Sequence, residues 1–393
     1  MAFTLTPVIG ENFIGRKDIV FELVKALPSK NKIGFSLSGI RRIGKTSILK
    51  EVTRVLQERW KIPVIYVSVW RVSPNTVDEF VRVLNRATLA AFEDKLPARF
   101  KFEELLATGA KALGRFLQNL KLSAQVSEDL EVSISYVRRE SNNVDEAITK
   151  SFSLIEDLAE MTKSPCVLML DEFPSLVDLT YGSKNQKIGE SIVKLLRTIY
   201  EEFELTRLVI SGSYRDTLEN LVGKQKAPFY KQLLLREVGP FNQSEFKEFL
   251  ERYLPDVNFV EETARVELLR VSSGIHYNLQ LVGKEIQFQG VRKIDTKSLR
   301  EVVNQVLEKE GQLLFTEFVE SLIPSEVKVL KALAKWPSAK PADIARQEFM
   351  DDNTVNSSLN WLVKKGILRR LARGLYEFTD NMFAEWLRAQ EKL

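Results

Sequence analysis

Gly39-Ile-Arg-Arg-Ile-Gly-Lys-Thr46 is the stretch that decides the predicted fold of this 393-residue chain. It follows residues 33–37, where apolar and polar side chains alternate as in a β-strand, and it precedes residues 47–59, whose apolar side chains recur at helical spacing. A strand, a GxxxxGK[ST] turn and a helix in this order form a phosphate-binding loop, or P-loop. The glycines let backbone N–H groups point at phosphate oxygens, Lys45 reaches the β- and γ-phosphates, and the Thr46 hydroxyl ligates Mg²⁺. We therefore predict ATP and Mg²⁺ as ligands, contacted by Gly39, Ile40, Arg41, Arg42, Ile43, Gly44, Lys45, Thr46 and Ser47.

A second motif supports the first. Cys166-Val-Leu-Met-Leu170 is an uninterrupted apolar run, as expected of a central parallel strand buried on both faces, and it ends in Asp171-Glu172. An acidic pair at the carboxyl end of such a strand is a Walker B arrangement. Asp171 is predicted to hold the Mg²⁺ shell, and Glu172 to orient and deprotonate the attacking water. The alternative, an aspartate that only caps a helix at the strand exit, is disfavoured by the P-loop upstream.

Further strands are predicted at residues 62–70 and, after a helix at 188–204, at residues 208–211. The second of these leads into Gly212-Ser213-Tyr214-Arg215. A polar side chain at this strand tip, Ser211 or Ser213, is predicted to sense the γ-phosphate. Arg215 is a candidate catalytic clamp on the transferred phosphoryl group, although a solvated arginine that opens the next helix fits equally well.

These motifs resemble those of STAND-type and archaeal AAA+-related ATPases, a group that includes MNS-like and origin-recognition-like proteins. The matching segments are FIGRKDIVFEL (residues 13–23), GIRRIGKTS (39–47), LMLDEFP (168–174), the strand end ISGS (210–213) and APFY (227–230). The resemblance implies an α/β fold: a parallel-sheet P-loop NTPase core of the ASCE/AAA+ type, an α-helical lid and a C-terminal winged helix-turn-helix. It also implies that Gly15 and Arg16 lie near the nucleotide base.

Two positions depart from the group's pattern. Lys231-Gln232 stand where the group often has an arginine after its "PLYG" motif, and the lid motif appears as Gly274-Ile-His276. His276, the single histidine of the chain, is a candidate phosphate contact from the lid. A histidine beside an apolar helix is more often a packed side chain, and that alternative is favoured here. Because a second sensor cannot be assigned, we predict slow hydrolysis.

The predicted domains are the ATPase core (residues 1–236), a helical lid (237–320) and the winged helix-turn-helix (321–393). The core carries an insertion at about 95–150, with a helix at 102–120 followed by a β-hairpin. The hairpin is interpreted as a partner-binding or oligomerisation feature, or as a cover for one edge of the sheet. The lid helices are expected at residues 244–253, 261–272, 277–288 and 295–319, with Asn242 and Ser244 as candidate N-caps.

The C-terminal pattern is helix, helix, helix, hairpin: 325–336, 341–347, 352–365 and two short strands around Ala372-Arg-Gly374, before a last helix. In such a domain the third helix enters the major groove of double-stranded DNA. The candidate DNA contacts are Asn356, Asn360, Lys364, Lys365, Arg369, Arg370 and Arg373. The alternative is a protein-interaction or autoinhibitory module, and Asp351 and Asp352 at the start of the third helix would repel phosphate.

Composition narrows the class of protein. The net charge is +4, and 44% of the residues are hydrophobic, which is ordinary for a globular chain. No apolar run approaches the roughly 18 residues of a membrane span, no signal peptide is evident, and the one cysteine, Cys166, lies in an apolar strand. We therefore expect a cytoplasmic, archaeal-type ATPase switch that couples nucleotide state to DNA or to an unknown protein partner, with oligomers possible. The alternative is a nucleotide-gated scaffold or transcription regulator with negligible turnover.

Overall fold

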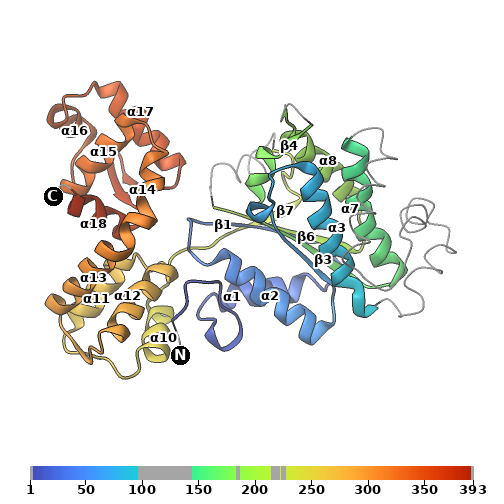
Figure 1. Ribbon diagram of the computed structural model, residues 1–393, viewed down its shortest axis with the longest axis horizontal. Coiled ribbons are helices and arrows are strands. Elements are labelled where there is room, and N and C mark those ends of the chain that lie inside the picture. Colours follow the sequence, from blue (N-terminus) through green and yellow to red (C-terminus); the bar gives the residue numbers. More distant parts are fainter. Residues whose placement is uncertain (1–2, 96–143, 183–185, 214–221, 223–226, 391–393) are drawn as a thin grey trace.

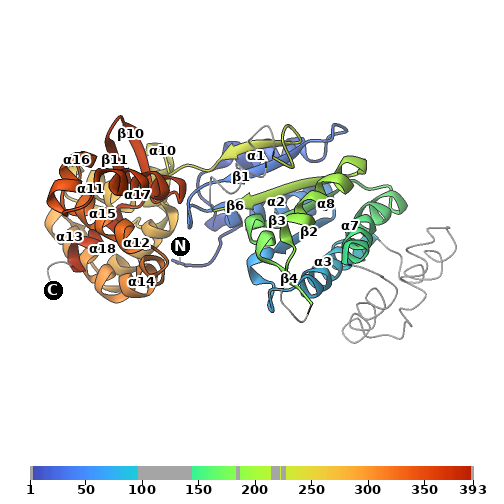
Figure 2. The same ribbon diagram turned by 90° about the horizontal axis from the view of Figure 1, so that it is seen from above.

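The computed structural model describes residues 3–95, 144–182, 186–213, 222 and 227–390 (Figure 1). The helix and hairpin predicted within the 95–150 insertion lie outside these residues, as does Arg215. None of the described helices combines the length and the apolar character needed to cross a membrane. The described chain forms a sheet-containing core at one end and a helical body at the other, and the two lie side by side along the long axis (Figures 1 and 2).

The core is built on a five-stranded sheet whose strands are all parallel, in the order β2-β3-β6-β1-β7. The strands are β1 (Gly34–Ser38), β2 (Val64–Ser68), β3 (Cys166–Asp171), β6 (Thr206–Gly212) and β7 (Leu233–Glu237). β1, β3 and β6 are buried along their whole length, because helices cover both faces of the sheet. Cys166 is fully buried in β3, as its apolar surroundings predicted.

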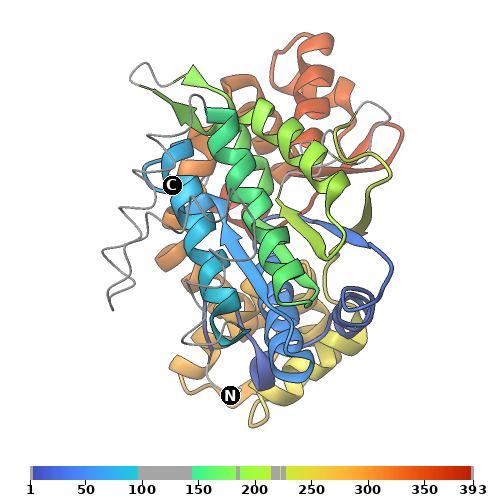
Figure 3. The ribbon, with the colours of Figure 1, turned by 90° about the vertical axis from the view of Figure 1, so that its right-hand side faces the viewer.

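Two apolar layers hold the helices on the sheet. The core helices are α1 (Lys17–Ala26), α2 (Lys45–Trp60), α3 (Val77–Phe92), α7 (Val144–Met161) and α8 (Gly189–Glu202). α1 and α2 pack on one face, and α3, α7 and α8 pack on the other. Figure 3 shows α3 and α7 lying next to each other across the sheet. One short antiparallel pair of strands accompanies these helices: β4 (Thr180–Tyr181) pairs with β5 (Gln186–Lys187).

The helical body begins after β7. The first part, residues 241–320, is called the lid segment below; its helices are α10 (Gln243–Tyr253), α11 (Glu262–Ser272), α12 (His276–Phe288), α13 (Thr296–Val306) and α14 (Gln312–Glu320). Asn242 is the N-cap of α10, in a reciprocal capping box with Glu245, so of the two candidate caps Asn242 is the one used. A short parallel pair, β8 (Asn258–Phe259) and β9 (Lys293–Ile294), joins two connections of this segment.

Residues 324–390, called the C-terminal segment below, contain the predicted order of elements. They are α15 (Pro324–Lys335), α16 (Pro341–Gln347), α17 (Asp352–Lys364), the antiparallel hairpin β10 (Leu368–Ala372) and β11 (Leu375–Phe378), and α18 (Asn381–Gln390). The buried face of α17 carries Val355, Leu359 and Leu362.

The structure corrects three sequence expectations. β7 is a strand, whereas helical structure was expected from residue 237 and no strand before it. The strand predicted at 62–70 ends at Ser68, where a 3-10 turn over Val69–Arg71 takes over. The single helix predicted at 295–319 is interrupted by a π-helical turn at Leu307–Gly311. A Cβ at Gly311 would lie 2.4 Å from Trp386 Cδ1, so the small residue lets α18 approach the helix closely at this turn.

Candidate nucleotide site

The predicted P-loop lies at the carboxyl edge of the sheet, between the end of β1 and the start of α2. Gly44 is the N-cap of α2 and has φ = 112°, a left-handed value that a side chain would strain. At Gly39 a Cβ would lie 2.7 Å from the carbonyl oxygen of Val238. Both glycines of the motif are therefore needed for the turn, one for its backbone conformation and the other for close packing on the chain beside it.

Lys45 is almost fully buried at the centre of the site, with 4% of the residue exposed. Its Nζ donates to the carbonyl oxygens of Gly39 and Ile40, both at 3.0 Å, and to Ser213 Oγ at 3.2 Å. Burial lowers the pKa of the ammonium group, and the negative charges of Glu172 and Asp171 oppose that shift. The lysine of α2 and the acidic pair of β3 thus interact electrostatically.

Asp171 is held by three hydroxyl groups. Thr46 Oγ1 donates to Asp171 Oδ2 at 2.8 Å, Tyr66 donates to the same oxygen at 2.7 Å, and Ser211 donates to Oδ1. Tyr66 comes from the neighbouring strand β2 and was not found by sequence reasoning. Burial raises the pKa of the Tyr66 phenol, and the charge of Asp171 adds to the effect, so the phenol remains a hydrogen-bond donor.

Glu172 follows directly in a left-handed conformation, with φ = 53°. Its Oε2 accepts from the backbone N of Ser213 at 3.2 Å, and its Oε1 accepts from the Ser213 hydroxyl. Ser211 and Ser213, the two candidate sensors, therefore have different partners. Ser211 donates to the Asp171 side chain and accepts from the backbone N of Glu172 at 3.3 Å, whereas Ser213 connects the Glu172 side chain to Lys45.

The donor set fits Mg²⁺. A threonine hydroxyl and a carboxylate, 2.8 Å apart, are hard oxygen ligands of the kind that Mg²⁺ takes when phosphate oxygens and water complete its shell. Within the described part of the chain, no group of three or more His, Cys, Asp and Glu side chains gathers to hold a metal by protein ligands alone. The site therefore suits a metal that arrives with a phosphate.

A cavity of about 350 Å³ opens over the P-loop. Its floor includes Lys45, Thr46 and Ser47 with Glu172 and Ser213. On the other side it is lined by residues 4–7 of the N-terminal segment and by His276 and Tyr277 of α12. The lid segment and the N-terminal segment thus both border the P-loop.

His276 borders this cavity but is also packed among aromatic rings. Its ring centroid lies 5.6 Å from that of Phe241 and 6.2 Å from that of Phe249, and Gln280 lies at hydrogen-bond distance, 3.2 Å. Burial, with a smaller contribution from the charge of Arg16, lowers the pKa of His276 to about 4. The imidazole is therefore neutral near pH 7, which is the state expected of a packed histidine.

Gly15 and Arg16 do not border the cavity; they contact the lid helix α10. Arg16 donates from its backbone N to Glu245 Oε1 at 2.6 Å and from Nη1 to Glu245 Oε2 at 3.0 Å, and its guanidinium lies over the Phe241 ring. A Cβ at Gly15, which has φ = 66°, would lie 2.6 Å from the same carboxylate. Nε and Nη2 of Arg16 are buried without a hydrogen-bond partner. In this structure the two residues fasten the core to the lid segment, and contact with a nucleotide base stays a prediction.

The N-terminal segment is a further feature that sequence reasoning missed. The backbone N of Val8 donates to Ser47 Oγ at 3.2 Å, and that of Thr4 donates to Gln280 Oε1 at 3.1 Å. Phe3 packs on Phe249 and Tyr253 of α10. The segment thus bridges α2 of the core and two lid helices, and the predicted ligand residue Ser47 serves as one of its anchors.

The candidate DNA residues lie on α17 and the hairpin, but they differ in surroundings. Asn356, Asn360, Lys364, Arg369, Arg370 and Arg373 are exposed. Lys365 instead pairs with the buried Glu326 at 2.8 Å and borders a cavity that faces the P-loop. Arg369 pairs with Glu377 across the hairpin. The structure therefore keeps six of the seven side chains exposed, whereas the half-buried Lys365 pairs with α15.

No protein-family model and no curated protein sequence matches this chain significantly. Solved structures do. A Walker-type ATPase of Pyrococcus abyssi superposes with a TM-score of 0.70 at 22% identity, over 99% of this chain and 100% of that one. The ORC2 protein of Aeropyrum pernix, in its ADPNP–ADP complexes, gives a TM-score of 0.58 at 14% identity, over 98% of each chain. The core has the AAA+ P-loop ATPase fold. At such identities the likeness establishes the fold alone.

Proposed function

We propose that this chain is an ATP-binding and slowly ATP-hydrolysing switch of the archaeal STAND/AAA+-related group. The observation that carries the proposal is a group of hydrogen-bonded side chains at the carboxyl edge of a parallel sheet, in which Ser213 joins Lys45 to Glu172 and Thr46 binds Asp171. Ligands of open α/β sheets bind at this edge. The two structural neighbours support the same function, since one is a Walker-type ATPase and the other is seen with ADPNP and ADP.

The proposed roles follow from the geometry. Backbone N–H groups between Gly39 and Thr46, together with Lys45, would bind the phosphates. Thr46 and Asp171 would hold Mg²⁺, which when bound neutralises the charge of the phosphates. Glu172 would orient the attacking water and accept its proton.

The second candidate function is that of a nucleotide-gated scaffold or regulator. It differs from the switch in that it binds ATP but hardly hydrolyses it. The contact that favours it is the double hydrogen bond from Ser213 to Glu172, which occupies both oxygens of the expected base. Steady-state phosphate release, measured with and without duplex DNA, separates the two functions. Steady multiple turnovers that disappear in Glu172→Gln support the switch, and release that stops at one phosphate per chain supports the scaffold.

Tyr66→Phe tests the Mg²⁺ site. The substitution removes one hydrogen bond to a charged carboxylate and keeps the ring, so we expect Mg²⁺-dependent ATP binding to weaken roughly tenfold. Calorimetric titration of ATP with and without Mg²⁺ measures this, and the loss should appear only with the metal present. Tyr181→Phe, an exposed tyrosine of β4, is the matched control. An equal loss in both titrations would show that Tyr66 does not act through the metal site.

We further propose that the C-terminal segment is a winged helix-turn-helix that binds DNA. The element order, the exposed asparagines of α17 and the exposed arginines of the hairpin support this. Asp351 caps α17 by accepting from the backbone N of Asn353 and Thr354, so its charge is partly satisfied by the helix terminus. That contact reduces the repulsion of phosphate expected from this residue.

Changing Arg369, Arg370 and Arg373 together to alanine tests DNA binding. If each contacts one phosphate, the slope of log affinity against log salt should fall by up to about 3. Fluorescence anisotropy with labelled duplex DNA over a salt series measures this slope. The control replaces Arg292, Lys293 and Lys297, exposed cations of the lid segment, and removes the same charge elsewhere. Equal losses in both variants would indicate a nonspecific effect of net charge and would count against DNA binding through the hairpin.

A further inference from the structure

The lid segment and the C-terminal segment share one continuous apolar core. It includes residues from Phe241, before α10, to Leu387 on α18, together with Ile14, while the sheet has two apolar layers, one of which includes Ile275 of the lid segment. Where the segments meet, Phe315 of α14 lies 5.2 Å from Phe383 and 5.6 Å from Trp386, centroid to centroid. Interiors packed in this way resist relative motion, because sliding would open cavities along the whole contact.

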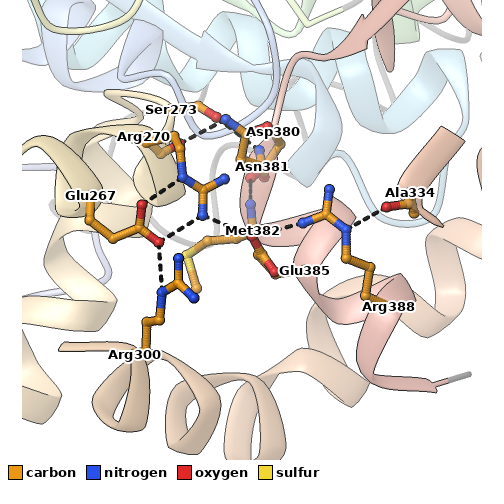
Figure 4. Close-up of polar contacts among 10 residues, drawn as sticks. All are labelled: Glu267, Arg270, Ser273, Arg300, Ala334, Asp380, Asn381, Met382, Glu385 and Arg388. Carbon is orange, nitrogen blue, oxygen red and sulfur yellow. Dashed lines mark hydrogen bonds and ion pairs between the residues drawn. The ribbon is translucent and has the colours of Figure 1, made fainter. Parts of the chain in front are cut away.

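A polar network closes the same junction (Figure 4). Asn381, the first residue of α18, donates from its side chain to the Arg270 carbonyl oxygen at 2.7 Å and from its backbone N to Ser273 Oγ at 2.8 Å. The Arg270 guanidinium binds Glu267 of its own helix, at 2.7 and 2.8 Å, and Glu385 of α18 at 3.0 Å. Arg270 therefore has anionic partners on both segments at once.

Asp380 extends this junction to the P-loop. Its carboxylate accepts from Asn278 Nδ2 of α12 at 2.8 Å and from the backbone N of Met382 at 2.9 Å, so it joins the lid segment to the start of α18. Asp380 also borders a cavity of about 90 Å³ whose opposite wall includes Arg41 and Arg42 of the P-loop. Arg42 has φ = 65° and its guanidinium lies 4.9 Å from the Tyr277 ring centroid. Burial raises the pKa of Asp380 to about 6; the hydrogen bonds from Asn278 and Met382 oppose this shift, and the charge of Arg42 opposes it more weakly.

The covalent connection between the core and the lid segment is short, and it lies in addition to the noncovalent contacts that Arg16 and Phe3 make with α10. The backbone N of Val238 still donates to Ser38 of β1, at 2.7 Å, and that of Phe241 already donates to Gly274 of the lid segment, at 2.8 Å. Only Gly239 and Pro240 lie between these anchors, and no atom lies within 4 Å of the position of a Cβ at Gly239. A hinge needs a few residues free to change φ and ψ, and Gly239 meets that condition.

We infer that the lid segment and the C-terminal segment form a single rigid body, fastened by the Asp380–Asn381 junction, and that this body faces the P-loop across the cavity lined by Asp380 and Arg42. Any movement of the lid segment then carries α17 and the hairpin with it. A second consequence rests on the proposed function. Nucleotide bound at the P-loop would move the candidate DNA-binding surface together with the lid segment, with no hinge between the lid segment and the C-terminal segment.

Distances between pairs of spin labels test the inference in the full chain. The native Cys166 is buried, so labels are placed at Lys194→Cys in the core, Lys297→Cys in the lid segment and Ser338→Cys in the C-terminal segment, all exposed positions. We expect one narrow distance distribution for the 297–338 pair, unchanged by Mg²⁺ and ATP. The 194–338 pair should give a broader distribution that shifts with nucleotide. A 297–338 distribution as broad as the 194–338 distribution, or one that shifts equally, would overturn the rigid body.

Two variants, one single and one double, test separately the role of Asp380 opposite Arg42 and the rigidity of the junction. Asp380→Asn removes the charge that faces Arg42 but keeps an acceptor for Asn278 and Met382, so it should broaden the 194–338 pair and leave the 297–338 pair narrow. Arg270→Gln with Asn381→Ala should broaden the 297–338 pair. An unchanged 194–338 distribution in Asp380→Asn would overturn the role of Asp380 in holding the rigid body against the P-loop. If calorimetry shows that the chain binds no ATP, the proposed function fails. The widths of the distance distributions measured without nucleotide still show whether the lid segment and the C-terminal segment form one rigid body.

Discussion

Replacement of Lys45 by alanine is expected to abolish measurable ATP binding. Lys45 Nζ is the cation at the centre of the site, within reach of the loop carbonyls and Ser213. A phosphate bound there would lose its one buried cationic partner from α2, in a region where burial strengthens electrostatic interactions. Removal of one group that stabilises developing negative charge typically costs about 10²–10³ in kcat, and we expect a loss of similar size in affinity for the charged phosphates.

The measurement is ATP titration by calorimetry, together with the shift in unfolding temperature that ATP produces. A ligand that binds the folded chain at 100 times its dissociation constant stabilises it by about 2.7 kcal/mol. The wild type should show such a shift, and Lys45→Ala none. Lys50→Ala, on the same helix but outside the cavity, is the control. An affinity in Lys45→Ala within about threefold of wild type would remove this lysine from the site.

The P-loop and Walker B motifs were predictable because their geometry is local. Eight consecutive residues define the P-loop, and an apolar run with its acidic end defines β3, so each motif carries its own strand and turn signals. The sheet then brings the two together, because parallel strands place their carboxyl ends at one edge. The Thr46–Asp171 contact, between residues 125 positions apart, follows from that topology.

The features that could not be predicted from the sequence depend on contacts between residues that lie far apart in the chain. The Tyr66 phenol reaches Asp171 only because β2 pairs with β3, and nothing near residue 66 signals that pairing. β7 was missed because it is an edge strand with exposed Leu234 and Leu235, which lack the alternation of a half-buried strand. Arg16 was expected near a nucleotide base from its local motif, yet its partner Glu245 lies 229 positions away in the lid segment.

The close packing of the lid segment against the C-terminal segment could not be predicted from the sequence either. Boundaries at residues 237 and 321 were predicted from changes in pattern, with a separate C-terminal domain as the natural consequence. The packing of Phe315 against α18 and the ties from Arg270 and Asn381 join the two sides of the second boundary. Amphipathic periodicity predicts that a helix has a buried face, but it does not predict which partner covers that face.

Glu172→Gln is expected to keep ATP binding and to lose turnover. The substitution preserves the shape of the side chain and leaves an acceptor for Ser213, but an amide cannot accept the proton of an attacking water. General-base catalysis contributes typically 10²–10⁴ in rate, so kcat should fall by about that factor, while ATP affinity stays within a few-fold of wild type. Phosphate release under saturating ATP, with calorimetry on the same preparation, measures both quantities.

A control at Glu190 and a variant of Ser213, the hydrogen-bond partner of Glu172, show whether the loss of turnover is due to Glu172 itself. Glu190→Gln, an exposed carboxylate at the start of α8, should leave both rate and affinity unchanged. Ser213→Ala removes the hydroxyl that binds Glu172 and also a partner of Lys45. If the contact from Ser213 restrains the base, its removal should raise kcat in a chain that still carries Glu172 and should have no effect on kcat in the Glu172→Gln background. Full turnover in Glu172→Gln would instead show that another group activates the water, because the only proton acceptor at the end of β3 besides Asp171 would then be absent.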